Sequence, residues 1–339
     1  MMRRLMQPGA QLIRQIGRLP PSPTVDLYLG QSCEDLLNAG VIRQLAPTVF
    51  ETETHRIVIR HDRGQVVRRG GKPIVYLTDD NVVAGIKSYG MPALQRAKLI
   101  TVDWKSARRL EDAADSIVVT SDLLSRIFGR RFPGKPVLQL APAWPVDDLP
   151  EPRPVEDAFH VALVMGASHV ADARPLMRPL LSALSQHSNL HLTISANLAP
   201  TRALVRHPRV TVVPSMEWPQ YRAWLAAQRF DLWLYPQLSG GAFNHARSAS
   251  KLGEAAQTGA ALMASKSWNA GVEAHAAGRC MMVENAPDAW IGALSEAIAD
   301  RDRNHEVARA NREALIAEDA PARQRAFWTE HLDLPRWAS

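Results

Sequence analysis

The stretch at residues 231–265 constrains the fold of this chain more than any other segment. It opens with the apolar run Leu232–Tyr235, and a short apolar run that stops at a proline predicts a buried parallel strand. The loop that follows contains Gly240 and Gly241, which can adopt backbone angles that other residues avoid. A helical segment and a second apolar strand at residues 261–264 complete the unit. The stretch therefore predicts one βαβ unit of a parallel sheet.

The helix of this unit carries charged residues on one face. Ser248 is expected to cap its N-terminus, and Gly259 to end it. Arg247, Lys251 and Glu254 follow the spacing i, i+4 and i+7, so they share a face near the N-terminal end. Two cations, one carboxylate and the free N–H groups of a helix N-terminus suit a phosphorylated ligand. The alternative is a solvated face with an ordinary Lys251–Glu254 ion pair, and the spacing alone does not choose between them.

Residues 243–265, read as FNHARSASKLGEAAQTGAALMAS, resemble the donor-binding segment of GT-B glycosyltransferases, in particular those of family 4. In that family, a loop with Phe-Asn and Lys/Arg-Ser leads into a helix that carries Lys-x-x-Glu. The resemblance implies that Glu254 hydrogen-bonds the ribose hydroxyls of a sugar nucleotide. It also implies that the rest of this donor side is formed by Lys251, Arg247, Ser248, Asn244 and the backbone at Gly241.

One position departs from the commoner family-4 pattern, which has two glutamates separated by seven residues. Ala246 stands where the first of them would be. A subgroup with Asn-x-x-(Lys/Arg)-Ser at this point also lacks that glutamate, and this chain resembles the subgroup.

Length and composition limit the number of domains and the kinds of protein that this chain can be. A chain of 339 residues can bury two cores, and no apolar run is long enough to span a membrane. Cys33 and Cys280 are the only cysteines, which argues against a disulfide framework and for a reducing, cytoplasmic compartment. No cysteine or histidine spacing indicates a zinc or haem site, so we expect no metal and no cofactor.

The net charge of +6 is unevenly distributed. Residues 1–150 hold 21 Lys and Arg against 15 Asp and Glu, whereas residues 151–339 hold 19 of each. The excess suits an anionic partner, such as a membrane surface or a lipid phosphate, or is simply a basic surface. Nucleic acid fits least, because no recognised binding motif is present. Residues 1–20 do not read as a signal peptide, and predict a basic amphipathic helix that lies on anionic lipid or packs on its own domain.

The N-terminal half alternates strand-like and helix-like segments, which predicts a doubly wound parallel sheet. The expected strands are residues 25–29, 56–60, 73–77, 117–120 and 136–140. In such sheets a ligand binds beyond the carboxyl ends of the strands. This rule nominates Arg60, His61, Asp79, Asp80 and Ser121. The structural alternatives are a turn for the two aspartates and a helix cap for Ser121.

The same half also resembles the family-4 subgroup. The segments IVIRHD, KPIVYLTDDNV and VVTSDLLSRIF are similar to its strand ending in Arg, its Tyr-x-x-Asp-Asp segment and the strand–Ser–helix segment that follows. The resemblance implies that Arg60, Asp79 and Ser121 lie on the acceptor side, across a central cleft from the donor. We expect Asp80 to act in catalysis together with Lys251 and Arg247.

The Pro-rich, acidic segment 147–157 predicts a linker, so residues 1–146 and 158–300 are expected to form the two domains. The second is expected to contain strands at 159–165, 190–194, 210–213 and 281–283, with helices at 174–185, 219–228 and 287–299. Its first strand leads into Gly166 and His169, which resemble the family's Gly-Thr/Ser-x-His segment. A glycine turn there brings phosphate close to backbone N–H groups. Residues 301–331 predict a helix, which in the family returns toward the first domain.

These expectations together describe two Rossmann-like domains and a glycosyltransferase that moves a sugar from a nucleotide-sugar donor to a glycan, lipid-linked or other acceptor. The family implies retention of the anomeric configuration, and the cations imply leaving-group stabilisation without a metal. Two alternatives stay open. One is an inactive GT-B-like scaffold that binds a nucleotide or glycan, and the other is a two-domain binding protein of the periplasmic type.

Overall fold

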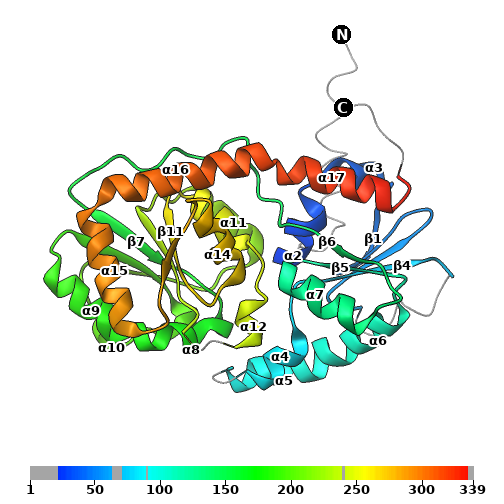
Figure 1. Ribbon diagram of the computed structural model, residues 1–339, viewed down its shortest axis with the longest axis horizontal. Coiled ribbons are helices and arrows are strands. Elements are labelled where there is room, and N and C mark those ends of the chain that lie inside the picture. Colours follow the sequence, from blue (N-terminus) through cyan, green and yellow to red (C-terminus); the bar gives the residue numbers. More distant parts are fainter. Residues whose placement is uncertain (1–21, 63–70, 89–90, 239–240, 335–339) are drawn as a thin grey trace, which may run out of the picture.

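The computed structural model describes residues 22–62, 71–88, 91–238 and 241–334. Within them the chain forms two six-stranded sheets, each covered by helices, that lie side by side (Figure 1). The prediction of an α/β fold with two largely parallel sheets is confirmed. The expected helix at residues 1–20 and the loop residue Gly240 lie outside the described residues.

The C-terminal half contains the sheet of order β12-β11-β10-β7-β8-β9, in which all pairs are parallel. Its strands are β7 Phe159–Leu163, β8 Leu190–Ser195, β9 Val210–Val213, β10 Leu232–Tyr235, β11 Ala261–Ser265 and β12 Met281–Val283. Every strand predicted for this half is present. The strand order reverses between β7 and β10, and such a reversal is where doubly wound sheets bind ligands.

The helices of this half are α8 Val170–Ala173, α9 Met177–Gln186, α10 Arg202–Val205, α11 Trp218–Ala226, α12 Ala242–His245, α13 Ser250–Ala256, α14 Asn269–Ala276 and α15 Pro287–Ala299. The N-cap expected at Ser248 is wrong, because α13 begins after Ala249, which makes no side-chain cap. Gly259 does adopt the positive φ expected of a helix-ending glycine, at 71°. A Cβ at Gly259 would lie 2.6 Å from the carbonyl oxygen of Glu151, so the position also has no room for a side chain.

The N-terminal half contains the sheet β1-β2-β3-β4-β5-β6, whose strands follow the chain in order. They are β1 Arg43–Ala46, β2 Val49–Glu51, β3 Arg56–Ile59, β4 Ile74–Thr78, β5 Ser116–Val119 and β6 Val137–Gln139. The strands from β3 onward pair in parallel and match the predictions. The antiparallel β1 and β2 at one edge were not predicted.

The strand expected at residues 25–29 is wrong. This segment is helical, formed by α2 Pro23–Val25 and the π-helical turn η1 Asp26–Gly30, and α3 Glu34–Ala39 follows. Ser22 caps α2 and Pro23 occupies its first turn, both of which favour a helix start. The run is apolar because the helix is buried on all sides, with Tyr28 only 2% exposed. A short apolar run does not distinguish a buried helix from a buried strand.

The other helices of this half are α4 Val82–Lys87, α5 Ala93–Lys98, the π-helical η2 Leu99–Trp104, α6 Lys105–Ala113 and α7 Asp122–Arg131. Ser121 caps α7 by accepting a hydrogen bond from the N–H of Leu124, so the structural alternative given for this residue, a helix cap, is present.

The C-terminal residues form two helices rather than one, α16 Arg301–Glu318 and α17 Ala320–His331, because Asp319 adopts a positive φ of 39° between them. Figure 1 shows α16 along the C-terminal half and α17 over the N-terminal half. The Nε2 atom of Gln324 donates to the carbonyl of Leu27 at 2.8 Å, and the indole N–H of Trp328 donates to that of Tyr28 at 2.8 Å. The end of the chain thus fixes the helical segment that the sequence had suggested was a strand.

Cys33 and Cys280 are free and buried, and burial raises the pKa of each thiol to about 12. Such thiols are unreactive at neutral pH. Across the described residues, no helix combines the length and the apolar character needed to cross a bilayer.

Candidate functional site

The predicted donor-side residues of α13 lie at the point where the strand order reverses. Lys251 Nζ donates to the carbonyl oxygen of Val164, just beyond β7, at 3.3 Å, and pairs with Glu254 Oε2 at 2.5 Å. The ammonium group also lies 5.7 Å from the ring centre of Tyr235, at the end of β10. Lys251 therefore stands between the ends of the two central strands, and its ion pair with Glu254 is present.

Glu254 is 8% exposed and is held by two donors. The Tyr221 hydroxyl donates to its Oε2 at 2.7 Å, beside the bond from Lys251. Burial, and then the neighbouring carboxylate, raise the pKa of Tyr221, so this phenol stays a donor. Within the described part of the chain, the hydrogen bonds to Glu254 all end on Oε2, which leaves Oε1 to accept others.

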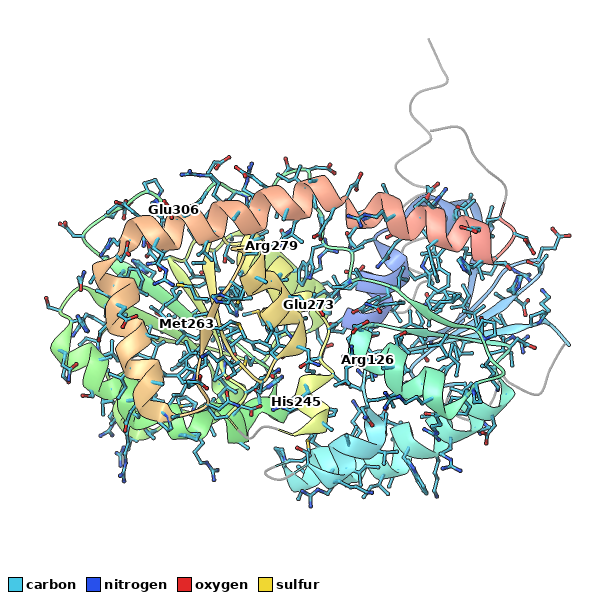
Figure 2. All side chains as sticks on the ribbon, in the orientation of Figure 1. Arg126, His245, Met263, Glu273, Arg279 and Glu306 are labelled. Atoms are coloured by element: carbon cyan, nitrogen blue, oxygen red, sulfur yellow. The ribbon has the colours of Figure 1, made fainter. Side chains whose placement is uncertain are left out.

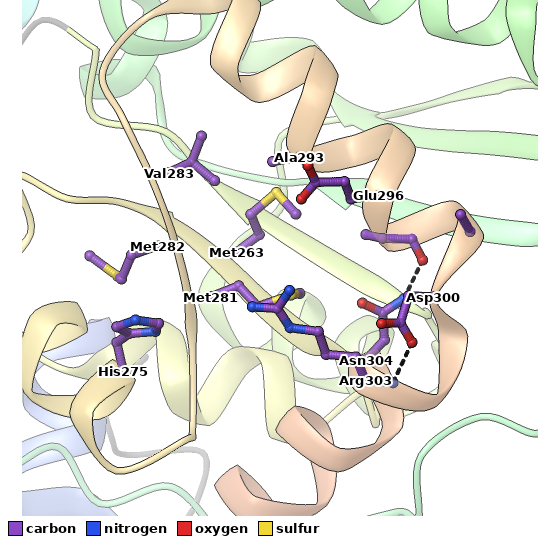
Figure 3. Close-up of a pocket in the computed structure, with 12 residues that line it drawn as sticks. Met263, His275, Met281, Met282, Val283, Ala293, Glu296, Asp300, Arg303 and Asn304 are labelled. Atoms are coloured by element: carbon purple, nitrogen blue, oxygen red, sulfur yellow. Dashed lines mark hydrogen bonds between the residues drawn. The ribbon is translucent and has the colours of Figure 1, made fainter.

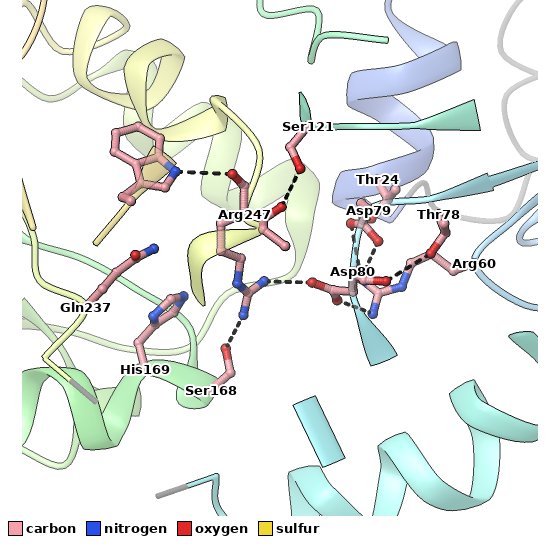
Figure 4. Close-up of polar contacts among 12 residues, drawn as sticks. Thr24, Arg60, Thr78, Asp79, Asp80, Ser121, Ser168, His169, Gln237 and Arg247 are labelled. Atoms are coloured by element: carbon pink, nitrogen blue, oxygen red, sulfur yellow. Dashed lines mark hydrogen bonds and ion pairs between the residues drawn. The ribbon is translucent and has the colours of Figure 1, made fainter. Parts of the chain in front are cut away.

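Arg247 joins the two halves (Figure 4). One guanidinium nitrogen lies 3.2 Å from Asp80 Oδ1 in the N-terminal half, and another donates to Ser168 Oγ at 3.4 Å in the C-terminal half. The guanidinium lies over the ring of Phe243, 4.3 Å from its centre. Asp80 and Arg247 are thus the closest oppositely charged pair between the predicted acceptor and donor sides.

The predicted acceptor-side residues meet at the carboxyl edge of the N-terminal sheet. Arg60, with a φ of +65°, follows β3 and pairs with Asp79 at 3.3 Å and with Asp80 at 3.0 Å. The Thr24 hydroxyl donates to Asp79 Oδ2 at 2.7 Å. His61 turns away and lies 3.4 Å from Thr48 Oγ1.

The two aspartates differ in acidity. Burial raises the pKa of Asp79 and outweighs the attraction of Arg60. Burial acts on Asp80 in the same direction, but Arg247 and Arg60 together outweigh it and lower its pKa. Neighbouring carboxylates whose environments separate their pKa values can hold different protonation states in one site.

His169 belongs to a buried polar chain. Its Nδ1 lies 2.9 Å from Asp172 Oδ2, and Asn244 Nδ2 donates to Asp172 Oδ1 at 3.0 Å. Burial lowers the pKa of His169 despite the carboxylate beside it, so the ring is neutral near pH 7. Figure 4 shows His169 beside Arg247, with Gln237 on the other side of the His169 ring in this view. With Nδ1 bonded to Asp172, Nε2 is the ring nitrogen that the described residues leave for another partner.

The glycines and Ser248 occupy the loops of the same region. Gly166 precedes the 3-10 turn η3 Ala167–His169, and the N–H of His169 donates to its carbonyl at 3.0 Å. Gly241, with a φ of +91°, begins α12. Ser248 lies in the loop between α12 and α13, close enough to Tyr28 of the N-terminal half to lower its pKa, although burial dominates and raises it.

Sequence reasoning missed several buried polar groups around this site. Tyr28 Oη and Thr120 Oγ1 lie close to each other and Tyr28 lies close to Ser248, whereas Gln237 Oε1 has no hydrogen-bond partner among the described residues. Gln237 is fully buried, and its amide nitrogen donates to the Tyr235 hydroxyl at 3.1 Å. Buried polar atoms normally have partners, so such groups mark places where a ligand or water is expected to bind. The position of Gln237, two residues after the last residue of β10, was the one signal in the sequence.

The predicted donor loop, residues 242–248, packs on the N-terminal half. Ala246 is 1% exposed within the core of that half, and its carbonyl accepts a 2.8 Å hydrogen bond from the Ser121 hydroxyl. A Cβ on Gly85 would lie 2.9 Å from the ring of Phe243, so α4 and α12 touch closely. Ser121 therefore contacts the donor loop as well as capping a helix.

A second contact between the halves centres on Asp26, which is 6% exposed. The indole N–H of Trp218 donates to it at 2.7 Å, Arg222 pairs with it at 2.9 Å, and the Gln31 amide donates at 3.0 Å. The buried Asp26 carboxylate thus accepts hydrogen bonds from both halves and helps to fix how they meet at the site.

The larger cavities lie elsewhere. One of about 360 Å³ lies between β11, β12, α15 and α16 and is lined by Met263, Met281, Glu296, Asp300, Arg303 and Asn304, among others (Figure 3). Figure 2 shows Met263 inside the C-terminal half, apart from His245 of the donor loop. None of the predicted site residues lines this cavity. Across the described residues, no group of three or more His, Cys, Asp or Glu is placed to hold a metal ion.

No protein-family profile matches the chain, and no curated protein matches it. Solved structures do. They include sucrose-phosphate synthase from Thermosynechococcus elongatus (15% identity, TM-score 0.55, covering 79% of this chain and 70% of that one) and TarM (11%, 0.59, 82% and 54%). A third is the pneumococcal O-GlcNAc transferase GtfA in complex with UDP and GlcNAc (11%, 0.56, 86% and 64%). The chain has the GT-B fold. It spans only 54% and 64% of TarM and GtfA, and at these identities the likeness shows the fold alone.

Proposed function

We propose that this protein is a retaining glycosyltransferase, related to the family-4 subgroup, that transfers a sugar from a nucleotide-sugar to a glycan or lipid-linked acceptor. The observation that carries the proposal is the convergence of Arg247, Lys251 and Glu254 at the strand-order reversal, with Asp80 directly across. Such reversals in doubly wound sheets bind nucleotides. A similar structure, GtfA, is named as a transferase in complex with UDP and GlcNAc, which supports the same ligand class here.

The donor side supplies positive charge where a leaving diphosphate would develop negative charge. Lys251 and Arg247 are 14% and 21% exposed at their side chains, so their charges are only partly screened by water. Positioned cations of this kind stabilise a leaving diphosphate without a metal. Glu254 Oε1 would accept from a ribose hydroxyl while Tyr221 and Lys251 fix the carboxylate through Oε2.

On the acceptor side, Asp80 would be ionised at neutral pH, because two arginines lower its pKa. It would orient Arg247 toward the diphosphate and lie near the acceptor hydroxyl. Arg60 and Asp79 would shape the acceptor subsite from the same sheet edge. The basic charge of the N-terminal half supports a peripheral position on an anionic membrane.

The test is a thermal-shift screen of UDP-, GDP-, ADP-, CMP- and dTDP-sugars, with and without EDTA, followed by turnover of the one that binds. A ligand that binds the native state raises the midpoint by mass action. Glu254→Gln and Lys251→Ala should each abolish the shift. The matched controls are Glu284→Gln and Lys266→Ala, which break an exposed ion pair of the same chemistry in the same half. Unchanged donor binding in both site variants would refute the assignment, and a shift lost in EDTA would refute metal independence.

An inactive GT-B scaffold is the second candidate, and one observation favours it. The position of the first glutamate in the commoner family pattern is Ala246, which is buried against the N-terminal half. A scaffold would bind a nucleotide or glycan without consuming it. Measurement of released nucleotide diphosphate from the bound donor, with a panel of glycan and lipid-linked acceptors, separates the two.

A further inference from the structure

Exposed apolar side chains concentrate on one region of the N-terminal half. Ten large apolar residues are exposed among the described residues, and five of them lie between positions 83 and 104. We call these the α4–α6 surface: Val83, Leu94, Ile100, Val102 and Trp104. Leu94 is 88% exposed and Trp104 is 38% exposed. Scattered exposed apolar residues are ordinary, but a contiguous cluster of them marks an interaction site.

The same segment is basic. From the start of α4 to the end of α6, residues 82–113 contain six Lys and Arg against three acids, Asp103, Glu111 and Asp112, of which only Asp112 is exposed. Lys87, Lys98, Lys105 and Arg108 are exposed, and none of them pairs with a carboxylate among the described residues. Their charges are therefore available to an anionic partner.

The apolar and basic side chains alternate along three consecutive helices. Helices α5, η2 and α6 follow one another without a break from residue 93 to residue 113. Within α5, Leu94 and Lys98 are four residues apart and share a face. The π-helical η2 then carries Ile100, Val102 and Trp104, and Lys105 begins α6. Apolar tips flanked by cations at the same level are the pattern of helices that lie in a bilayer interface.

A cavity of about 340 Å³ continues the apolar surface inward. It is lined by Val82, Val83, Trp104, Arg108, Ile127 and Phe128, among others. Two residues of the α4–α6 surface thus border a recess with apolar walls and a polar margin, where Arg108 lies beside the Arg131–Glu111 ion pair. The surface offers an amphiphile this recess beside the exposed apolar side chains.

We propose that the α4–α6 surface docks on an anionic lipid bilayer, with Leu94 and Trp104 entering the interface and Lys87, Lys98, Lys105 and Arg108 near the head groups. Residues 1–21 hold four arginines and no acid, so charge disfavours them as a cover for this surface. A second copy would bring like charges together. The docking goes beyond the proposed transfer reaction and does not require a sugar nucleotide, so vesicle binding tests it separately.

The first experiment measures co-sedimentation of the full chain with vesicles of phosphatidylcholine alone or with 30% phosphatidylglycerol added, a composition chosen on the order of natural anionic content. Binding should require the anionic lipid and weaken as salt shortens the screening distance. Each cation near such a surface contributes about fivefold in partitioning, equivalent to about 1 kcal/mol. Lys98→Gln with Lys105→Gln should therefore reduce binding roughly 25-fold, and Leu94→Gln should reduce it at constant charge.

The matched control is α10, where exposed Val205 lies between exposed Arg202 and Arg206 in the C-terminal half. Arg202→Gln with Arg206→Gln removes the same charge, and Val205→Gln removes a comparable apolar tip. These controls should bind vesicles as the unchanged protein does. Equal losses in the two sets would mean that only net charge matters, and unchanged binding in the α4–α6 variants would mean that another segment binds. Either result overturns the proposal, as does a stable dimer by light scattering together with no vesicle binding.

Trp104 gives a second readout. It is the most exposed of the described tryptophans, at 38%. Lipids brominated on the upper acyl chain should quench the fluorescence of the full protein, and Trp104→Phe should remove most of that quenching while vesicle binding persists. Equal quenching in Trp104→Phe would show that this surface does not enter the bilayer.

Discussion

Gly253 lies between the two residues on which the proposed donor site depends, Lys251 and Glu254, and the backbone of α13 at Gly253 packs against a tryptophan. A Cβ at Gly253 would lie 2.0 Å from one atom of the Trp144 ring and 2.3 Å from another. The ring is 3% exposed and contacts Trp218 edge-on at 5.8 Å, so it has no free direction in which to move. Gly253→Ala must therefore push α13 and the tryptophan apart.

The expected change in the free energy of unfolding has three contributions, two that destabilise the variant and one that stabilises it. Overpacking a filled core costs about 1–3 kcal/mol. The Trp144 indole N–H donates to Ser250 at 3.3 Å, and loss of that bond adds about 1 kcal/mol. Alanine recovers about 1 kcal/mol through its higher helix propensity than glycine. We expect a net destabilisation of about 1–3 kcal/mol, with weaker donor binding because Lys251 and Glu254 move with the helix.

The assay is urea unfolding of Gly253→Ala beside Gly292→Ala. Gly292 lies within α15, and a Cβ there meets nothing within 4 Å. The control should thus be neutral or stabilised by up to about 1 kcal/mol. Opposite signs for the two substitutions are the expected result. If Gly253→Ala were as stable as Gly292→Ala, the close packing of α13 against Trp144 would be wrong.

Three further perturbations have definite expected outcomes. Asp26→Asn removes the charge bonded from both halves and should lower the unfolding free energy by about 1.5–3 kcal/mol in urea. Burial lowers the pKa of His169, so the unfolded chain binds the extra proton below about pH 6.5 and stability falls as pH decreases; His169→Gln should flatten that slope. Ala199 has a φ of +50°, a conformation that costs alanine more than glycine, so Ala199→Gly should stabilise the protein by about 1 kcal/mol and raise its thermal midpoint.

The C-terminal half could be read from the sequence because its strands are short apolar runs bounded by turn residues. The run at Leu232–Tyr235 is fully buried and pairs on both sides, as a central parallel strand must. The helix spacing placed Lys251 and Glu254 on one face, and the structure has the two side chains paired there. Short apolar strands and helix faces depend on residues that are close in the sequence, so the pattern of apolar and polar residues can predict them.

The N-terminal half was harder for physical reasons. Residues 25–29 are apolar because α17 covers them, and that contact joins residues about 300 positions apart, as the Trp328–Tyr28 hydrogen bond shows. The edge strands β1 and β2 have only four and three residues, too few to show a period. The Arg247–Asp80 pair spans 167 positions, and nothing local in either segment indicates it.

The departure at Ala246 has a structural reason. Its side chain is packed into the core of the N-terminal half, and its carbonyl accepts from Ser121. A glutamate there would bury a carboxylate among apolar side chains, which costs several kcal/mol unless it is paired. The absence of the first glutamate thus accompanies a donor loop that docks on the opposite half. The adjacent Arg247 then reaches Asp80 across the boundary, so the charge that the proposed diphosphate would meet is positioned by both halves at once.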